Sequence, residues 1–174
     1  MIVFGKLEQI LFKIEKVLVM IPFVAIFITV VEQVFQRYFN LPIPDTSDIS
    51  LVSQATFTFL SVGLLVYTGG HITIEVHKLI KNVNILFVIE LVGSICMLFI
   101  AGIFTYLGYG LLAYALESGS ATMALRIPLW IPYGSMLVGM VLMIIHQIGV
   151  ILKLFYYRKH PSERVADIDI ESMR

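Results

Sequence analysis

The chain has 174 residues, of which 59% are hydrophobic and only 14% are charged. Its mean hydropathy of +0.93 lies far from that of soluble domains, so the composition predicts an integral membrane protein. The formal net charge is zero and no long basic run occurs, which excludes a nucleic-acid-binding surface of the usual kind. The single cysteine, Cys96, excludes an intrachain disulfide.

Four apolar stretches are long enough to cross a membrane, for which a helix needs about 20 mostly apolar residues. They lie at about 17–39, 49–68, 85–115 and 128–157. The sequence therefore predicts an all-α integral membrane protein, with a four-transmembrane-helix domain over residues 17–157.

Two segments outside the spans have different characters. Residues 1–16 place apolar side chains on one helical face and most of their lysines on the other, so we expect an amphipathic interfacial helix on the inner leaflet. Residues 158–174 are polar and show no periodicity, which indicates a cytoplasmic tail.

The lysines and arginines outside the spans set the expected orientation. Of the 12, all but Arg37 and Arg126 fall on the side of the membrane that also holds both chain ends. Because cytoplasmic loops carry an excess of positive residues, both ends are expected in the cytoplasm.

One polar cluster lies in the outer half of the first span. Glu32 and Gln36 are four residues apart and therefore share a helix face. A membrane-embedded acid suggests a proton or cation site, but the spans offer no further acid near mid-membrane. We favour the alternative that this cluster packs against a neighbouring helix or a partner subunit.

A histidine within the fourth span, His146, raises the question of a b-type haem. A b-haem needs two facing histidines inside the bilayer, and only His146 lies clearly at that depth. We therefore expect a hydrogen-bonded packing histidine. No nucleophile and base stand together with supporting residues, so we expect no enzyme, no metal site and no cofactor in this chain.

Small residues mark a packing surface on the last two spans. They recur every seven residues in the third span and at a four-residue spacing in the fourth, a pattern that lets helix backbones approach closely. The candidates for packing against a partner subunit are Ser94, Ala101, Gly108, Ser135 and Gly139.

Three short motifs make the chain recognisable. The first span ends in an Arg-aromatic-x-Asn-x-Pro stretch, a Gly-Gly-His-Ile stretch ending in an acid follows the second span, and an Ile-Pro-Leu-Trp stretch enters the fourth. The residues concerned are Arg37, Asn40, Pro42, Gly69, Gly70, His71, Glu75, Pro128 and Trp130. In length, span number and motif order the chain resembles the small permease subunit of tripartite ATP-independent periplasmic (TRAP) transporters.

The resemblance implies a bacterial inner-membrane protein with two protein partners. One is a large permease subunit that binds the coupling sodium ions, and the other is a periplasmic substrate-binding protein. The small subunit would brace the first and help dock the second during uptake of an organic acid, such as sialic acid or a C4-dicarboxylate. The docking candidates are Arg37, Asp45, Asp48 and Arg126. The family's usual Trp-Ser-Glu-Glu is replaced here by residues 45–48, of which only the final acid persists.

Two other classes stay open at this point. A self-contained multidrug or proton-coupled carrier would use Glu32 to bind protons and cations. A b-haem membrane anchor for electron transfer would use His146.

Overall fold

The computed structural model describes residues 2–68 and 83–159. This part of the chain forms four helices: α1 (Ile2–Phe39), α2 (Ser47–Tyr67), α4 (Val83–Ser118) and α5 (Trp130–Lys159). All four are long and apolar enough to cross a membrane. The predicted all-α, four-span architecture is confirmed.

Helix α1 runs without a break through the boundary predicted at residue 16. Residues 3–16 are therefore continuous with the first span and form no separate helix. In this segment Ile10 and Ile14 are more than half exposed, whereas Glu8 and Glu15 are buried. The acidic side chains thus face the other helices and the isoleucines face outward. The position of this segment on the inner leaflet stays a prediction.

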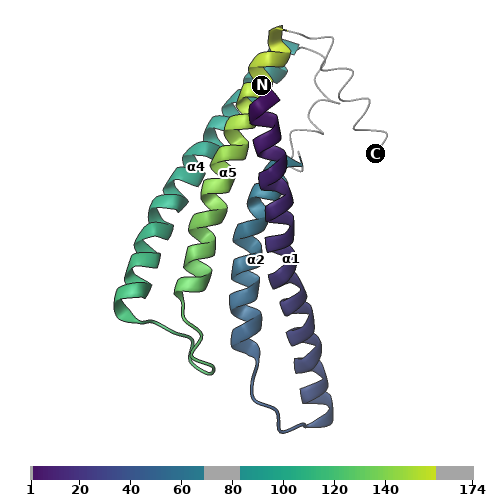
Figure 1. Ribbon diagram of the computed structural model, residues 1–174, viewed down its shortest axis with the longest axis vertical. Coiled ribbons are helices and arrows are strands. Elements are labelled where there is room, and N and C mark those ends of the chain that lie inside the picture. Colours follow the sequence, from purple (N-terminus) through teal and green to yellow (C-terminus); the bar gives the residue numbers. More distant parts are fainter. Residues whose placement is uncertain (1, 69–82, 160–174) are drawn as a thin grey trace.

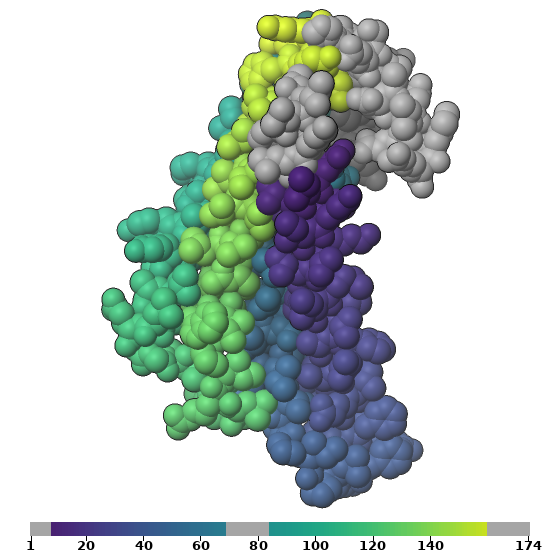
Figure 2. Space-filling model, viewed as in Figure 1, coloured from purple at the N-terminus to yellow at the C-terminus, as the bar shows by residue number. Residues whose placement is uncertain are grey.

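The four helices stand in a row and not in a closed bundle. Helix α4 packs against α5, α5 packs against α2, and α2 packs against α1, whereas α1 touches α5 only briefly and α4 not at all. Figure 1 shows α4 and α1 at the two edges of the row, and in Figure 2 parts of all four helices reach one broad face. Along the helix axes, α1 starts and α5 ends on the same side of the molecule, which we call the terminal end. The loops 40–46 and 119–129 lie at the other, the loop end.

The closest helix contact joins α2 to α5 at Gly139. A Cβ atom there would overlap the backbone carbonyl oxygen of Phe59, so only glycine permits this approach. Beside it a small core of buried residues forms between α2, α4 and α5, consisting of Val66, Ala101, Met140 and Met143. Methionine adapts its shape to irregular gaps, which suits a seam between three helices.

The small residues predicted for partner contact pack inside the chain. Ser94 is 6% exposed and Ala101 is fully buried, on the helix whose contacts are all with α5. Gly108 lies against Met136 of α5, since a Cβ at Gly108 would stand 3.5 Å from its Cγ. The space beside these residues, like the space beside Gly139, is occupied by other helices of this chain. A direct contact of these small residues with a partner subunit stays a prediction. Faces of the helices that are more exposed are better placed for such a contact.

Several hydroxyl groups within the spans donate to carbonyl oxygens of their own helix, whereas the buried Thr56 hydroxyl has no partner among the described residues. Thr29 donates to the carbonyl oxygen of Ala25, and Thr105 donates to that of Ala101. Ser135 donates to the carbonyl oxygen of Pro132, so this predicted partner-contact residue spends its hydroxyl within α5. Such local bonds let polar residues sit in an apolar environment without a neighbouring helix.

Candidate functional site

A set of ionisable side chains joins α1 to α5 in the half of the molecule nearer the terminal end, and all of them are buried except Lys153, which is 47% exposed. Glu8 and Glu15 come from α1, and His146 and Lys153 come from α5. Each pair is seven residues apart, which places both members on one helix face. We call these four residues the charge ladder.

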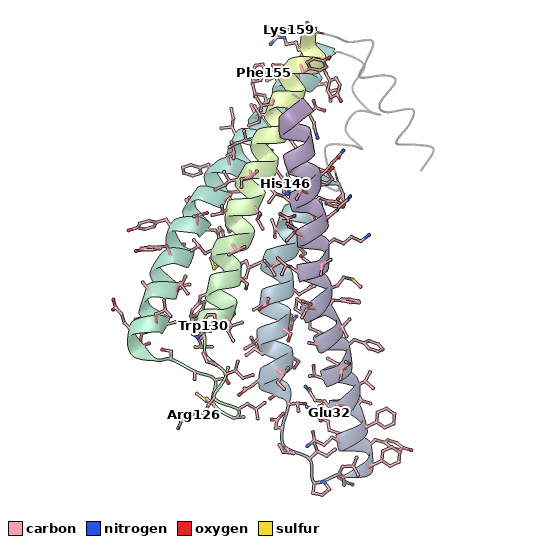
Figure 3. All side chains as sticks on the ribbon, in the orientation of Figure 1. Glu32, Arg126, Trp130, His146, Phe155 and Lys159 are labelled. Carbon is pink, nitrogen blue, oxygen red and sulfur yellow. The ribbon has the colours of Figure 1, made fainter. Side chains whose placement is uncertain are left out.

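The ladder alternates acids with bases. Lys153 Nζ lies 3.4 Å from Glu8 Oε2, Glu8 Oε1 lies 3.6 Å from His146 Nδ1, and His146 Nε2 lies 3.1 Å from Glu15 Oε1. His146 is fully buried, and Glu8 and Glu15 are 3% and 2% exposed. Figure 3 shows His146 well inside α5, away from both Trp130 and Lys159. This order arises because α1 and α5 run antiparallel. In the direction in which residue numbers rise along α1, they fall along α5.

Helix α2 shapes the space around the ladder. A Cβ atom at Gly63 would lie 3.1 Å from Glu15 Oε1, so the absent side chain leaves room for Glu15 to pass beside α2. The ring of Tyr67 stacks on Phe12 with centroids 4.4 Å apart and meets the His146 ring edge-on at 5.3 Å. Lys153 Nζ lies 5.7 Å from the centre of the same tyrosine ring. The aromatic rings thus cover one side of the charges.

The ladder contains two buried acids, Glu8 and Glu15, in the part of α1 that was expected to precede the first span. Sequence reasoning placed Glu8 and Glu15 before the first span and considered His146 alone. The signal that could have found the cluster is the matched seven-residue spacing of ionisable residues on two antiparallel helices. His146 is hydrogen-bonded, as predicted for a packing histidine. Its Nε2 atom lies 3.1 Å from a carboxylate oxygen of Glu15, and its Nδ1 atom lies 3.6 Å from one of Glu8.

At the loop end, Asp48 ties two loops together. Its Oδ2 atom accepts hydrogen bonds from the backbone N–H groups of Ala124, at 2.9 Å, and Leu125, at 2.8 Å. The Thr122 side chain also hydrogen-bonds to this carboxylate. The first turn of α2 therefore holds the loop between α4 and α5. Arg37, another of the docking candidates, forms no ion pair with Asp48 within 4.0 Å in the described residues.

The loop 119–129 is a small hairpin. Ala121 and Pro128 form an isolated antiparallel bridge, and the Ile127 N–H donates to the Thr122 hydroxyl at 2.9 Å. Arg126 has a φ of 57°, in the left-handed region, and Met123 at the tip is 99% exposed. The docking candidate Arg126 is thus presented on a tight turn with its side chain exposed.

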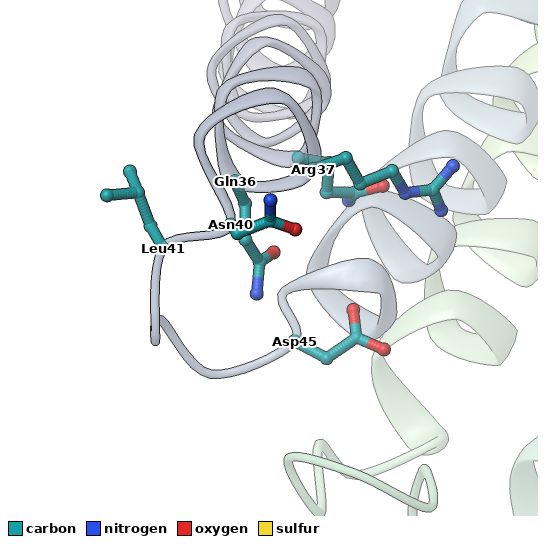
Figure 4. A pocket seen from close by; sticks show the side chains of 6 residues that line it. Gln36, Arg37, Asn40, Leu41 and Asp45 are labelled. Carbon is teal, nitrogen blue, oxygen red and sulfur yellow. The ribbon is translucent and has the colours of Figure 1, made fainter.

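An open pocket lies beside the other loop. It is lined by Gln33, Gln36, Arg37, Asn40, Leu41 and Asp45. Figure 4 shows the polar side chains around this pocket and Leu41 turned away from them. The Gln36 amide donates to the Ile43 carbonyl oxygen, and Asp45 accepts from the Ser47 N–H at 2.9 Å. Asp45 thereby satisfies the first backbone N–H of α2, because its side-chain oxygen accepts a bond that the helix itself cannot supply.

The remaining predicted residues, among them Glu32, Asn40 and Trp130, lie outside the charge ladder. Glu32 is half-buried on α1 near the loop end, and among the described residues it has no ion-pair partner within 4.0 Å (Figure 3). Asn40 takes a positive φ of 48° and ends α1, which explains the Asn-x-Pro pattern, while Trp130 begins α5 and is 49% exposed. The motif residues Gly69, Gly70, His71 and Glu75 lie outside the described residues.

Comparison with known families identifies the chain. The model of the family described as tripartite ATP-independent periplasmic transporters, DctQ component, matches residues 26–156, which is most of the chain. No curated protein matches it. The match begins within the first span and covers α2, α4, nearly all of α5 and both loops at the loop end, and it agrees with the resemblance drawn from the three motifs. The chain therefore belongs to the DctQ family, the small membrane component of TRAP transporters.

Proposed function

We propose that this chain braces the large permease subunit in the bacterial inner membrane and helps dock the periplasmic binding protein during sodium-coupled uptake of an organic acid. In this proposal the large subunit binds the sodium ions and carries the transport path. The observation that carries the bracing role is the row of helices. A closed bundle hides its inner faces, whereas a row leaves both broad faces of every helix open for a partner or for lipid.

The outward face of α4 is the best candidate for contact with the large subunit. Leu98, Phe99, Gly102, Ile103, Tyr106 and Leu107 line an open groove there. Phe99 and Tyr106 are 69% and 78% exposed, and a Cβ at Gly102 would meet nothing within 4 Å. Large side chains flanking a glycine form a hole into which a residue of another helix can insert.

The depth of Tyr106 argues for a protein on this face. It lies twelve residues before Ser118, the last residue of α4, or about 18 Å along the helix axis. The hydrocarbon core is about 30 Å thick, so with the end of α4 at the membrane surface the Tyr106 hydroxyl is expected well inside the core. Side chains lean toward the helix N-terminus, which here points away from the loop end. Lipid tails offer the hydroxyl no hydrogen bond, whereas a polar group of a partner helix does.

The docking role falls on the loop end. Arg126 and Met123 are exposed on the hairpin that Asp48 holds, and Arg37 lines the neighbouring pocket. Asp48 has its carboxylate engaged by backbone N–H groups, so it supports docking by positioning the hairpin. Reversing the charge of Arg126 is expected to reduce binding-protein-dependent uptake without changing the amount of complex.

Copurification tests the bracing role. Replacing Phe99 and Tyr106 together by alanine removes two exposed side chains that a partner would contact, and with them van der Waals packing and an interhelical hydrogen bond of about 1–2 kcal/mol. We expect the amount of large subunit captured through a tag on this chain to fall at least about tenfold. The matched control replaces Phe27 and Val34 of α1, which have the same spacing and are 66% and 62% exposed. Equal capture by both double variants would contradict the assignment to α4.

A further inference from the structure

Two buried polar atoms in the charge ladder face each other without a hydrogen bond. They are Oε1 of Glu8 and Nδ1 of His146, and they lie 3.6 Å apart. Their side chains are 3% and 0% exposed, so bulk water does not reach them. A buried polar atom without a partner costs about 1–3 kcal/mol, and two that face each other suggest a shared proton.

The other nitrogen of the ring sharpens the argument. His146 Nε2 lies 3.1 Å from Glu15 Oε1, within hydrogen-bond distance. A neutral imidazole carries one N–H and one lone pair. If both carboxylates are ionised, one ring nitrogen donates and the other turns its lone pair toward a carboxylate oxygen, which is repulsive. One additional proton, on Nδ1 or on Glu8 Oε1, turns the second contact into an attraction.

The charges of the neighbouring groups lead to the same count. Two carboxylates and the Lys153 ammonium give the ladder one net negative charge when His146 is neutral, and one more proton makes the ladder neutral. Uncompensated charge is costly in a buried site. The titratable groups packed around the Glu8–His146 contact are Glu15, Tyr67 and Lys153. Glu90, also buried, lies on α4, the helix that packs against α5.

We propose that Glu8 and His146 form a proton-binding site inside the chain, which holds one proton between Oε1 and Nδ1. The proton is taken from water and forms an N–H or O–H bond, and nothing else is exchanged. It fastens the first turns of α1 to α5 where the two helices otherwise touch only briefly. This proposal goes beyond the bracing role and does not depend on it.

Solid-state NMR on the full-length chain in lipid nanodiscs at pH 7 tests the site directly. Histidine nitrogens are labelled with ¹⁵N, and the His146 signals are identified in a chain whose other three histidines are replaced by glutamine. We expect His146 to carry protons on both nitrogens. If the proton sits on Glu8 instead, infrared spectroscopy will show a protonated carboxyl band, and this band will disappear in Glu8→Gln.

The variants locate the proton. In Glu8→Gln the amide can donate to Nδ1, so a neutral His146 suffices and its second N–H signal should be lost. The control Glu32→Gln removes an acid from the same helix outside the ladder and should leave the His146 signals unchanged. A neutral His146 in the parent chain, together with no carboxyl band sensitive to Glu8→Gln, would overturn the proposal. The NMR part of this test is measured on the parent chain, so it does not depend on whether a variant folds.

Discussion

Glu15 and His146 meet at 3.1 Å across α1 and α5, and neither side chain is more than 2% exposed. Helix α1 otherwise packs on α2. The charge ladder is therefore the polar link from α1 to α5, which lies on the other side of α2. Gly63 makes the link possible by leaving space beside the Glu15 carboxylate. The contact of α1 with α5 thus depends on ionisable side chains and on one missing side chain.

Removing the Glu15 carboxylate should destabilise the chain strongly. Glu15→Ala leaves His146 with one carboxylate partner and opens a buried gap, and losing one member of a buried ion pair typically costs about 3–5 kcal/mol. We expect a clear drop in the melting temperature of the purified chain in nanodiscs, measured by intrinsic fluorescence. Glu117→Ala, at an exposed position on α4, serves as control. If the two variants melt alike, the ladder does not hold α1.

A second test concerns the approach of α2 to α5 at Gly139. Gly139→Ala introduces a methyl group that overlaps the carbonyl oxygen of Phe59, and backbone atoms cannot move aside cheaply. We expect the loss of folded protein or a strong fall in melting temperature, in line with overpacking costs of about 1–3 kcal/mol or more. Gly134→Ala on the same helix is the control, because its Cβ would stand 3.9 Å from Leu112 in ordinary contact. Similar stability for both variants would contradict the tight contact.

The sequence predicted the number of spans and most of their ends, because lipid imposes a length and an apolar composition that a local stretch of sequence reveals. The start of α1 is the exception. The sequence also predicted that Ala101 and Gly139 lie in helix contacts, since small residues allow backbones to approach. It did not predict which helix each would touch, because nearly every face of these helices is apolar. The arrangement in a row follows from contacts between distant residues that no local pattern encodes.

The polar sites divide in the same way. Asn40 and Asp45 act within a few residues of their own positions, and turn and cap chemistry makes such residues recognisable. Asp48 bonds to backbone groups 76 and 77 residues away, and Glu15 reaches 131 residues along the chain to His146. These partners depend on the helix packing. The sequence therefore identified the charged residues near the loops but missed the charge ladder.

The hairpin at the loop end should loosen when Asp48 is replaced. Asp48→Ala removes the carboxylate that accepts from the Ala124 and Leu125 N–H groups, so the hairpin loses its two hydrogen bonds to the first turn of α2. Trypsin cutting after the exposed Arg126 reports the opening of this loop. We expect cleavage at least about tenfold faster than in the parent, because cleavage follows the population of the open form.

The control for this prediction is Asp45→Asn. Its side-chain oxygen can still accept from the Ser47 N–H, so the cap of α2 is retained while a nearby charge is lost. Cleavage after Arg126 should then stay close to the parent rate. An equal acceleration in both variants would mean that net charge, and not the hold of Asp48 on the hairpin, governs trypsin access.

The predicted orientation can be read at the hairpin tip. Met123 is 99% exposed, so a cysteine placed there in a chain with Cys96→Ala should react with a membrane-impermeant maleimide. Because ten of the twelve lysines and arginines are expected on the cytoplasmic side, the tip is expected in the periplasm, and intact spheroplasts should label it fully. A cysteine replacing Lys159, at the opposite end of the row, should label only after the membrane is opened (Figure 3). The reverse pattern would place both chain ends outside and would remove the hairpin from any role in docking a periplasmic protein.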